Sequence, residues 1–115
     1  MSQELEDRFF RFAKNVRDFC LKLKWNTINR EYIRQLIRSS GSVGANYIEA
    51  SDDLGKLDEK LKINFQKRSK ESVHWLGLVL CYDDKQLIKE QQSLRDEGMQ
   101  ITKILSSILI KLSKT

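Results

Sequence analysis

The sequence predicts an all-α protein: a single domain over residues 1–115, folded as an antiparallel up-down-up-down four-helix bundle. The 115 residues include no proline and only five glycines, which favours long uninterrupted helices. Apolar residues recur at spacings of three and four, the period of a helix with one buried face, near residues 4–25, 29–50, 56–82 and 90–112. Short connections separate these segments, and short connections place successive helices antiparallel.

The first expected helix, residues 4–25, has the apolar seam of a bundle helix. Acidic residues occupy its first turn and basic residues its last, which suits the helix macrodipole. A break at Asn26 and Thr27 follows, and we expect Asn29 or Thr27 to cap the next helix. The seam residues are Leu5, Phe9, Phe12, Val16, Phe19 and Leu23.

The second expected helix, residues 29–50, contains a run of small residues in its middle. The run from Ser40 to Ala45 has the composition of a turn, but the helical spacing of apolar residues continues through it. Glycine inside a helix costs about 1 kcal/mol relative to alanine. We therefore expect Gly41 and Gly44 to face a closely packed neighbouring helix. The alternative is two helices broken by a glycine-serine loop.

Residues 51–55 are typical of a helix end followed by a turn, and the third helix is expected over residues 56–82. The last connection starts at Asp83, and we expect Leu87 and Ile88 to hold it against the bundle. The predicted core residues of the third helix are Leu57, Leu61, Phe65, Ser72, Trp75, Leu76 and Val79. Those of the fourth, residues 90–112, are Leu94, Ile101, Leu105, Ile108 and Leu112. Additional apolar residues in the fourth helix predict deep burial or a partner subunit: Ile104, Leu109 and Ile110.

Composition limits the classes of function. The formal net charge of +5 and the pI near 9.3 permit an acidic partner such as nucleic acid, although many proteins without such a partner are equally basic. Cys20 and Cys81 lie in apolar neighbourhoods, so we expect reduced core thiols in a cytoplasmic protein. The N-terminal residues are acidic, unlike those of a signal peptide, and no apolar run reaches the ~18 residues that a membrane span needs.

No group of residues predicts an enzyme, a metal site or a cofactor. Glu71 and His74 have the spacing of a di-iron ligand pair, but such a site needs a second pair and two more carboxylates, and the chain contains one histidine. The cysteines lack a CxxC partner. The segment from Gly41 to Gly44 lacks the lysine and the preceding strand of a phosphate-binding loop.

Polar residues of the second and third helices form a first candidate site. Ser42, Asn46 and Glu49 fall on one helical face, and Glu71 is flanked by basic residues. These residues form either a ligand site or a hydrogen-bonded network that fixes the register of the helices, since buried polar groups need partners. We favour the structural role.

Basic residues form a second candidate site, for nucleic acid. Arg30, Arg34 and Arg38 recur every four residues and share one helical face. A guanidinium can hold two phosphate oxygens, so a row of them suits a phosphate backbone. A second candidate patch lies on the third helix and consists of Lys60, Lys67, Lys70 and His74. The alternative is a solvated face with structural ion pairs, and exposed aromatic stacking platforms for single strands are not evident.

The segment Arg38–Ala50 resembles the second-helix signature of the 23S ribosomal RNA intervening-sequence proteins. That signature has an Arg, small residues, a Ser-[Ile/Val]-x-Ala-Asn core and an acidic residue three positions after the Asn. The third-helix signature is also matched, and the resemblance extends from about residue 8 to residue 112. The matching residues are Ser42, Gly44, Asn46, Glu49, Glu71 and Trp75.

The resemblance implies a four-helix bundle assembled as a five-subunit ring, with no catalytic role for the motif residues. It also places the chain near the accessory proteins of diversity-generating retroelements, which bind nucleic acid and a reverse transcriptase. We expect a non-catalytic homo-oligomer, which the resemblance implies is a pentamer. We expect it to bind nucleic acid, with RNA favoured over DNA, and/or a nucleic-acid-processing protein such as a reverse transcriptase. The alternative is a structural protein–protein interaction module that binds no nucleic acid.

Overall fold

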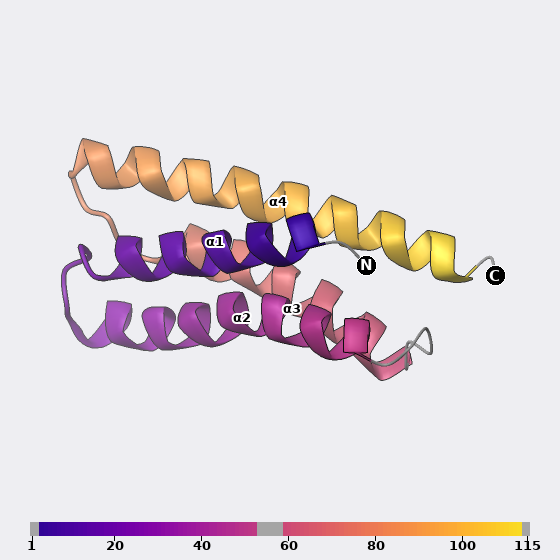
Figure 1. Cartoon of the computed structure of the whole chain (residues 1–115). Coiled ribbons are helices and arrows are strands. Elements are labelled where there is room, and N and C mark those ends of the chain that lie inside the picture. The colour runs from indigo at the N-terminus through magenta and orange to yellow at the C-terminus, as the bar shows by residue number, and fades with distance from the viewer. Residues whose placement is uncertain (1–2, 53–58, 114–115) are drawn as a thin grey trace.

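The computed structural model is an all-α, antiparallel up-down-up-down four-helix bundle, as the sequence predicts (Figure 1). It describes the backbone of residues 3–52 and 59–113 and the side chains of residues 3–49 and 64–111. The helices are α1 (Gln3–Cys20), α2 (Thr27–Asp52), α3 (Glu59–Leu78) and α4 (Lys85–Ser113).

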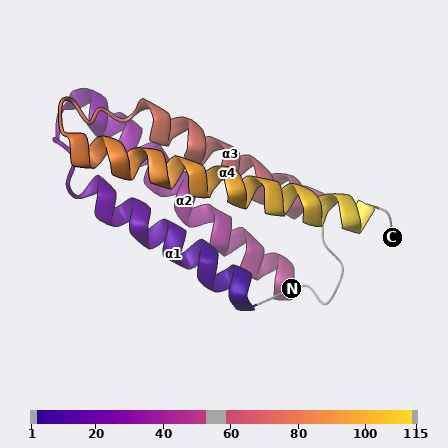
Figure 2. The ribbon, with the colours of Figure 1, turned by 90° about the horizontal axis from the view of Figure 1, so that it is seen from above.

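Each helix contacts the next one, and α1 also contacts α4, which closes the bundle. Figures 1 and 2 show the α1–α2 and α3–α4 connections, residues 21–26 and 79–84, together at one end of the bundle. We call this the loop end. The opposite end holds the start of α1 and the end of α4.

α2 runs without a break from Thr27 to Asp52, through both of its glycines. The prediction of one helix is confirmed, and the alternative of two helices broken by a loop is excluded. A Cβ atom added to Gly44 would lie 3.5 Å from Cβ of Phe9 in α1, so Gly44 faces a neighbouring helix as predicted. A Cβ atom added to Gly41 would meet no atom within 4 Å, so the same prediction for Gly41 is wrong. The two glycines lie about 60° apart around the helix, which turns Gly41 out of the contact.

The tightest glycine contact is at Gly98 in α4, a residue that the sequence pattern did not single out. A Cβ atom added to Gly98 would lie 2.8 Å from Cγ2 of Val73 in α3 and 3.4 Å from Cζ of Phe12 in α1. Gly98 is buried between these helices. A side chain at this position would therefore force α3 and α4 apart.

α1 ends at Cys20, not near Trp25 as predicted. The amide N–H groups of Lys22 and Leu23 donate to carbonyl oxygens three residues earlier, at 3.0 and 3.2 Å, instead of continuing the α-helical pattern. Such tightening is common where a helix terminates.

Asn26, not Asn29 or Thr27, caps α2, which corrects the predicted cap. The Oδ1 atom of Asn26 accepts the Asn29 amide at 2.9 Å, and its backbone oxygen accepts the Arg30 amide at 2.8 Å. This is the bonding of an N-cap residue, which satisfies donors that have no partner within the helix.

α3 ends at Leu78 rather than near residue 82, and α4 begins at Lys85 rather than near residue 90. Asp84 caps α4, because its Oδ1 atom accepts the amides of Gln86 and Leu87, both at 3.1 Å. Leu87 and Ile88 therefore belong to the first turn of α4 and not to the connection. Leu87 is buried as expected, whereas Ile88 is exposed.

A side chain of α4 also satisfies the carbonyl end of α3. Nε2 of Gln91 donates to the backbone oxygens of Leu76 and Val79, at 2.7 and 3.0 Å. The last carbonyl groups of a helix have no N–H partner within that helix. The early end of α3 is therefore stabilised from the neighbouring helix.

Asn29 joins the two connections at the loop end. Its side chain is fully buried. Its Nδ2 donates to the backbone oxygens of Lys24 and Leu80, at 2.9 and 3.0 Å, and its Oδ1 accepts the Leu80 amide at 2.8 Å. Three hydrogen bonds thus hold the α1–α2 connection against the α3–α4 connection.

The core is built around aromatic side chains from three helices. Tyr47 of α2 lies edge-on to Phe9 of α1 and to Phe65 of α3, with ring centroids 5.0 and 6.3 Å apart. The predicted seams are confirmed where the structure describes them, with Leu5, Trp75, Leu94 and Ile108 only partly buried. Ile110 is 56% exposed, so the apolar surface of α4 is not all buried within one chain. Predicted core residues that lie outside the described side chains are Leu57, Leu61 and Leu112.

Small hydroxyl residues link the helices through the core. Ser72 of α3 donates to Ser39 Oγ of α2 at 3.2 Å, and the Ser69 hydroxyl lies 2.6 Å from the Thr102 hydroxyl of α4. Gln66 of α3 donates to Ser106 Oγ of α4 at 2.7 Å. These bonds fix the register of α3 against both of its neighbours.

Both cysteines are buried free thiols. Burial raises the pKa of Cys20 to about 12. The pKa of Cys81 is also raised, by burial first and then by the nearby carboxylates of Asp84 and Glu90. Of the helices described, none combines the length and apolar character needed to cross a membrane.

Candidate nucleic-acid interface

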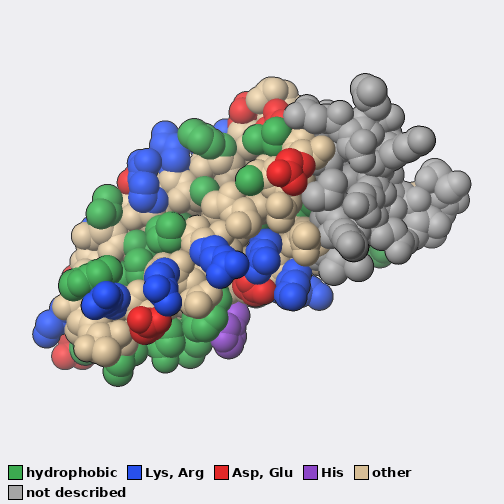
Figure 3. Space-filling view, turned by 90° about the horizontal axis from the view of Figure 1, so that it is seen from below, with side chains coloured by type: hydrophobic (Ala, Val, Ile, Leu, Met, Phe, Trp, Pro, Cys, Tyr) green, Lys and Arg blue, Asp and Glu red, His purple; other side chains and the backbone are tan. Residues whose placement is uncertain are grey.

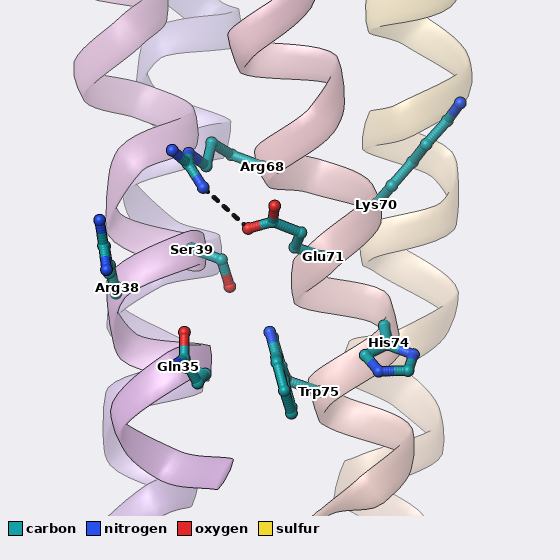
Figure 4. Close-up of a pocket in the computed structure, with 8 residues that line it drawn as sticks. All are labelled: Gln35, Arg38, Ser39, Arg68, Lys70, Glu71, His74 and Trp75. Atoms are coloured by element: carbon teal, nitrogen blue, oxygen red, sulfur yellow. Dashed lines mark hydrogen bonds and ion pairs between the residues drawn. The ribbon is translucent and has the colours of Figure 1, made fainter. Parts of the chain in front are cut away.

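A surface pocket of about 450 Å³ opens between α2 and α3. Figure 4 shows the residues that line it: Gln35, Arg38 and Ser39 from α2, and Arg68, Lys70, Glu71, His74 and Trp75 from α3. Arg68 extends from α3 toward α2, and the Trp75 indole points into the space between the two helices. Lys70 and His74 extend to the other side of α3, away from α2.

The pocket combines positive charge with an aromatic wall. Nη1 of Arg68 donates to Oε2 of Glu71 at 2.9 Å, an ion pair about 30% exposed on each side. Arg38 is exposed and forms no ion pair among the described residues. The Trp75 ring lies against Tyr32, with centroids 5.9 Å apart, and edge-on to His74 at 5.0 Å.

Arg38 is also the last residue of the predicted arginine row. Arg30, Arg34 and Arg38 are all exposed, one helical turn apart, so their Cα atoms rise about 6 Å per step along α2. Of the three, only Arg34 forms an ion pair among the described residues, with Glu31 at 3.6 Å and both side chains largely in solvent. Figure 3 shows Lys and Arg side chains in a row along this face, with acidic side chains beside them.

The lysines of the second candidate patch are placed less regularly. Lys67 and Lys70 are exposed on α3. Lys60 belongs to α3, but its side chain lies outside the described residues. Arg68, which was not assigned to either candidate patch, is the residue of α3 that reaches toward the arginine row.

The motif residues of the family resemblance do not share one site. Ser42 donates to the backbone oxygen of Arg38 at 2.7 Å within α2, and Glu49 is exposed. Asn46 is half-buried and forms no side-chain hydrogen bond among the described residues. The hydrogen bonds that fix helix register instead involve hydroxyl residues such as Ser39 and Ser72, and Glu71 and Trp75 line the pocket.

Three aromatic side chains are exposed, although the sequence made no aromatic stacking platform evident. Trp25 is 67% exposed and Tyr82 is 53% exposed, both at the loop end, and Phe10 is 65% exposed on α1. A sequence signal for Trp25 existed, because it falls outside the α1 seam and beside the polar break at Asn26. The signal was missed because Trp25 was included in the first predicted helix.

No group of three or more His, Cys, Asp or Glu residues that could hold a metal ion occurs within the described part of the chain. The raised pKa of both thiols keeps them protonated, and a protonated thiol is a poor nucleophile. Guanidinium groups arranged along a helix are, in contrast, suited to binding successive phosphates.

No protein-family model, no curated protein and no solved structure matches the chain.

Proposed function

We propose that this chain is a non-catalytic, homo-oligomeric nucleic-acid-binding protein whose phosphate-binding face is the arginine row of α2. The observation that carries the proposal is the exposure of Arg30, Arg34 and Arg38 at one-turn intervals. Arg68 of α3 extends toward α2 on the side of the pocket that Arg38 lines. Arg30 and Arg38 have no described counter-ion within the chain, so they can take phosphate oxygens without breaking an internal ion pair. The resemblance to intervening-sequence proteins favours RNA.

The decisive experiment replaces the three arginines together with glutamine. Each phosphate contact releases counterions, so log affinity should fall with log salt by about 0.7 per contact for a single strand and about 0.9 for B-DNA. The triple variant should bind every sequence more weakly and with a flatter salt dependence, because phosphate contacts carry no base information. Unchanged binding would place the site elsewhere.

A matched control removes the same charge from another face. Lys89, Lys103 and Lys111 are exposed on α4, outside the α1–α2 groove, and changing all three to glutamine lowers the net charge of +5 by the same three units. If affinity depended only on overall charge, both triple variants would weaken binding equally. The proposal requires the α2 variant to lose much more affinity than the α4 variant.

Oligomer formation has support from exposed apolar surface. Phe10, Ala13, Ile37 and Gly41 line a shallow groove between α1 and α2, in which Gly41 leaves room for a neighbouring chain to approach. By resemblance the assembly is a pentamer, which would repeat the arginine row and multiply a weak contact. Light scattering should then give about five times the 13.5 kDa mass of the chain.

The exposed apolar side chains also favour a second candidate function, a protein–protein interaction module without nucleic acid. Phe10 and Ile37 are 65% and 41% exposed, and aromatic and aliphatic groups anchor protein interfaces. A reverse transcriptase or another protein would be the partner. An oligomer that binds neither RNA nor DNA at low salt would support this second function against the first.

A further inference from the structure

The loop end carries an exposed aromatic surface in a held position. Asn29 bonds the two connections together through Lys24 and Leu80, and Nδ2 of Asn26 donates to the hydroxyl oxygen of Tyr82 at 2.6 Å. Trp25 and Tyr82 nevertheless remain 67% and 53% exposed. Core packing does not require two large aromatic rings in water at this position. Figure 3 shows hydrophobic side chains gathered toward this end of the molecule.

The backbone of Tyr82 supports the same conclusion. Its φ angle is 53°, a left-handed conformation that is rare for a bulky side chain. Such a conformation persists only where surrounding contacts hold it, and it is often found at functional sites. Here the contacts are the hydrogen bond from Asn26 and the Lys24 ammonium, which lies 5.3 Å from the centroid of the Tyr82 ring.

The aromatic surface adjoins the start of the arginine row. Trp25 directly precedes the cap residue Asn26, whose backbone oxygen accepts the Arg30 amide at 2.8 Å. A strand whose phosphates follow Arg30, Arg34 and Arg38 along α2 would therefore bring a base to the loop end. The rise of about 6 Å between successive arginines is close to the spacing of phosphates along an extended strand.

We infer that the loop end is a base-stacking platform, on which the Trp25 indole takes an unpaired base of a single-stranded nucleic acid bound along the arginine row. The base faces of a duplex are covered by their neighbours, whereas a single strand can place a base on an aromatic ring. The face therefore selects single strands over duplexes. This inference rests on the proposed function, because the arginines supply the phosphate contacts.

The test measures the affinity of a short mixed-sequence RNA strand and of the same strand paired with its complement, by fluorescence anisotropy. Changing Trp25 to Ala should weaken single-strand binding about tenfold, the effect expected for losing one stacked base. Duplex affinity and the salt slope should remain unchanged, and Trp25→Phe should retain most of the single-strand affinity. Met99→Ala, which removes an exposed apolar side chain from α4, away from both the arginine row and the α1–α2 groove, should change neither affinity.

The outcomes separate this inference from the proposed function. If the glutamine variant of the arginine row loses binding but Trp25→Ala binds the single strand normally, phosphate binding stands and the platform is wrong. Equal losses for strand and duplex in Trp25→Ala would also overturn the platform. A direct readout uses the Trp75→Phe variant, in which Trp25 is the one remaining tryptophan. Its fluorescence should be quenched by the single strand and not by the duplex.

Discussion

The hydrogen bonds of Asn29 allow a quantitative prediction about folding. Changing Asn29 to Ala removes three bonds of 2.8–3.0 Å to backbone groups of Lys24 and Leu80. A buried hydrogen bond contributes about 1 kcal/mol net, and leaving its partner unsatisfied costs about 1–3 kcal/mol. We therefore expect the free energy of unfolding to fall by about 3–5 kcal/mol, a large part of the roughly 5–15 kcal/mol typical of a domain.

Urea denaturation followed by circular dichroism measures this loss, with all variants at one protein concentration because oligomers gain stability from association. Asn15→Ala is the matched control, since Asn15 is exposed on α1 and its replacement should change stability by no more than about 0.5 kcal/mol. A loss below about 1 kcal/mol in Asn29→Ala would show that the hydrogen bonds of Asn29 do not hold the loop end together.

The Asn29→Asp variant separates the donor from the acceptor. Its carboxylate keeps the acceptor for the Leu80 amide but faces the backbone oxygens of Lys24 and Leu80 without a donor. The folded state therefore favours the protonated acid, and its folded pKa is raised above the unfolded value. The stability that protonation supplies is complete below the unfolded pKa and is lost as the pH rises through the folded pKa. Asn29→Asp should thus be unstable at neutral pH and recover in mild acid, and a pH-independent stability would contradict this reasoning.

Further predictions concern two glycines and the buried thiol of Cys20. Gly98→Ala should lower the melting temperature, because its Cβ would lie 2.8 Å from Cγ2 of the stiff Val73 side chain and such overpacking costs about 1–3 kcal/mol. Gly41→Ala, which meets no atom within 4 Å, should raise it by the equivalent of up to about 1 kcal/mol, and shifts of the same sign would refute the packing argument. Burial raises the pKa of Cys20 from 9.0 to about 12. The folding stability that comes from keeping this thiol neutral is therefore complete below pH 9 and is lost as the pH rises toward 12. In a Cys81→Ser variant, a thiol reagent at neutral pH should therefore label Cys20 only as fast as the protein unfolds, whereas rapid labelling would contradict its burial.

The helices and their buried faces were predictable because they depend on periodicity. The spacing of Phe9, Phe12, Val16 and Phe19 defines one face of a helix whatever its partner. The continuity of α2 through Gly41 and Gly44 followed from the same rule. Local composition, which indicated a turn, was the weaker predictor because tertiary packing stabilises the helix on both sides of the glycines.

The helix ends were less predictable because side chains distant in the sequence determine them. α3 ends at Leu78. The side-chain amide of Gln91 in α4 donates hydrogen bonds to two backbone oxygens at this end, and the side chain of Asn29 in α2 accepts the Leu80 amide. Gly98 shows the same limit, since only the placement of Val73 and Phe12 makes a side chain there unacceptable. Periodicity carries no information on these contacts.

The candidate site divides in the same way. The exposed row of Arg30, Arg34 and Arg38 was readable from spacing alone. The pocket was not, because it requires α2 and α3 to be placed side by side before Arg38 and Arg68 approach the same space. Predicting the exposed aromatic surface required knowing that α1 ends at Cys20, and this end depends on contacts within the loop.

The side chains proposed to bind nucleic acid at the loop end differ from the side chain that stabilises it, so the two effects can be separated. Asn29 is fully buried and makes no contact with solvent, whereas Trp25 and Arg30 are exposed on either side of the cap residue. A substitution of Trp25 or Arg30 should therefore change binding at constant stability. Asn29→Ala should lower both the stability and the binding affinity, because it releases the connection that positions Trp25. If stacking depends on a held ring, the folded Asn29→Ala protein should lose single-strand affinity while keeping the salt slope that the arginine row determines.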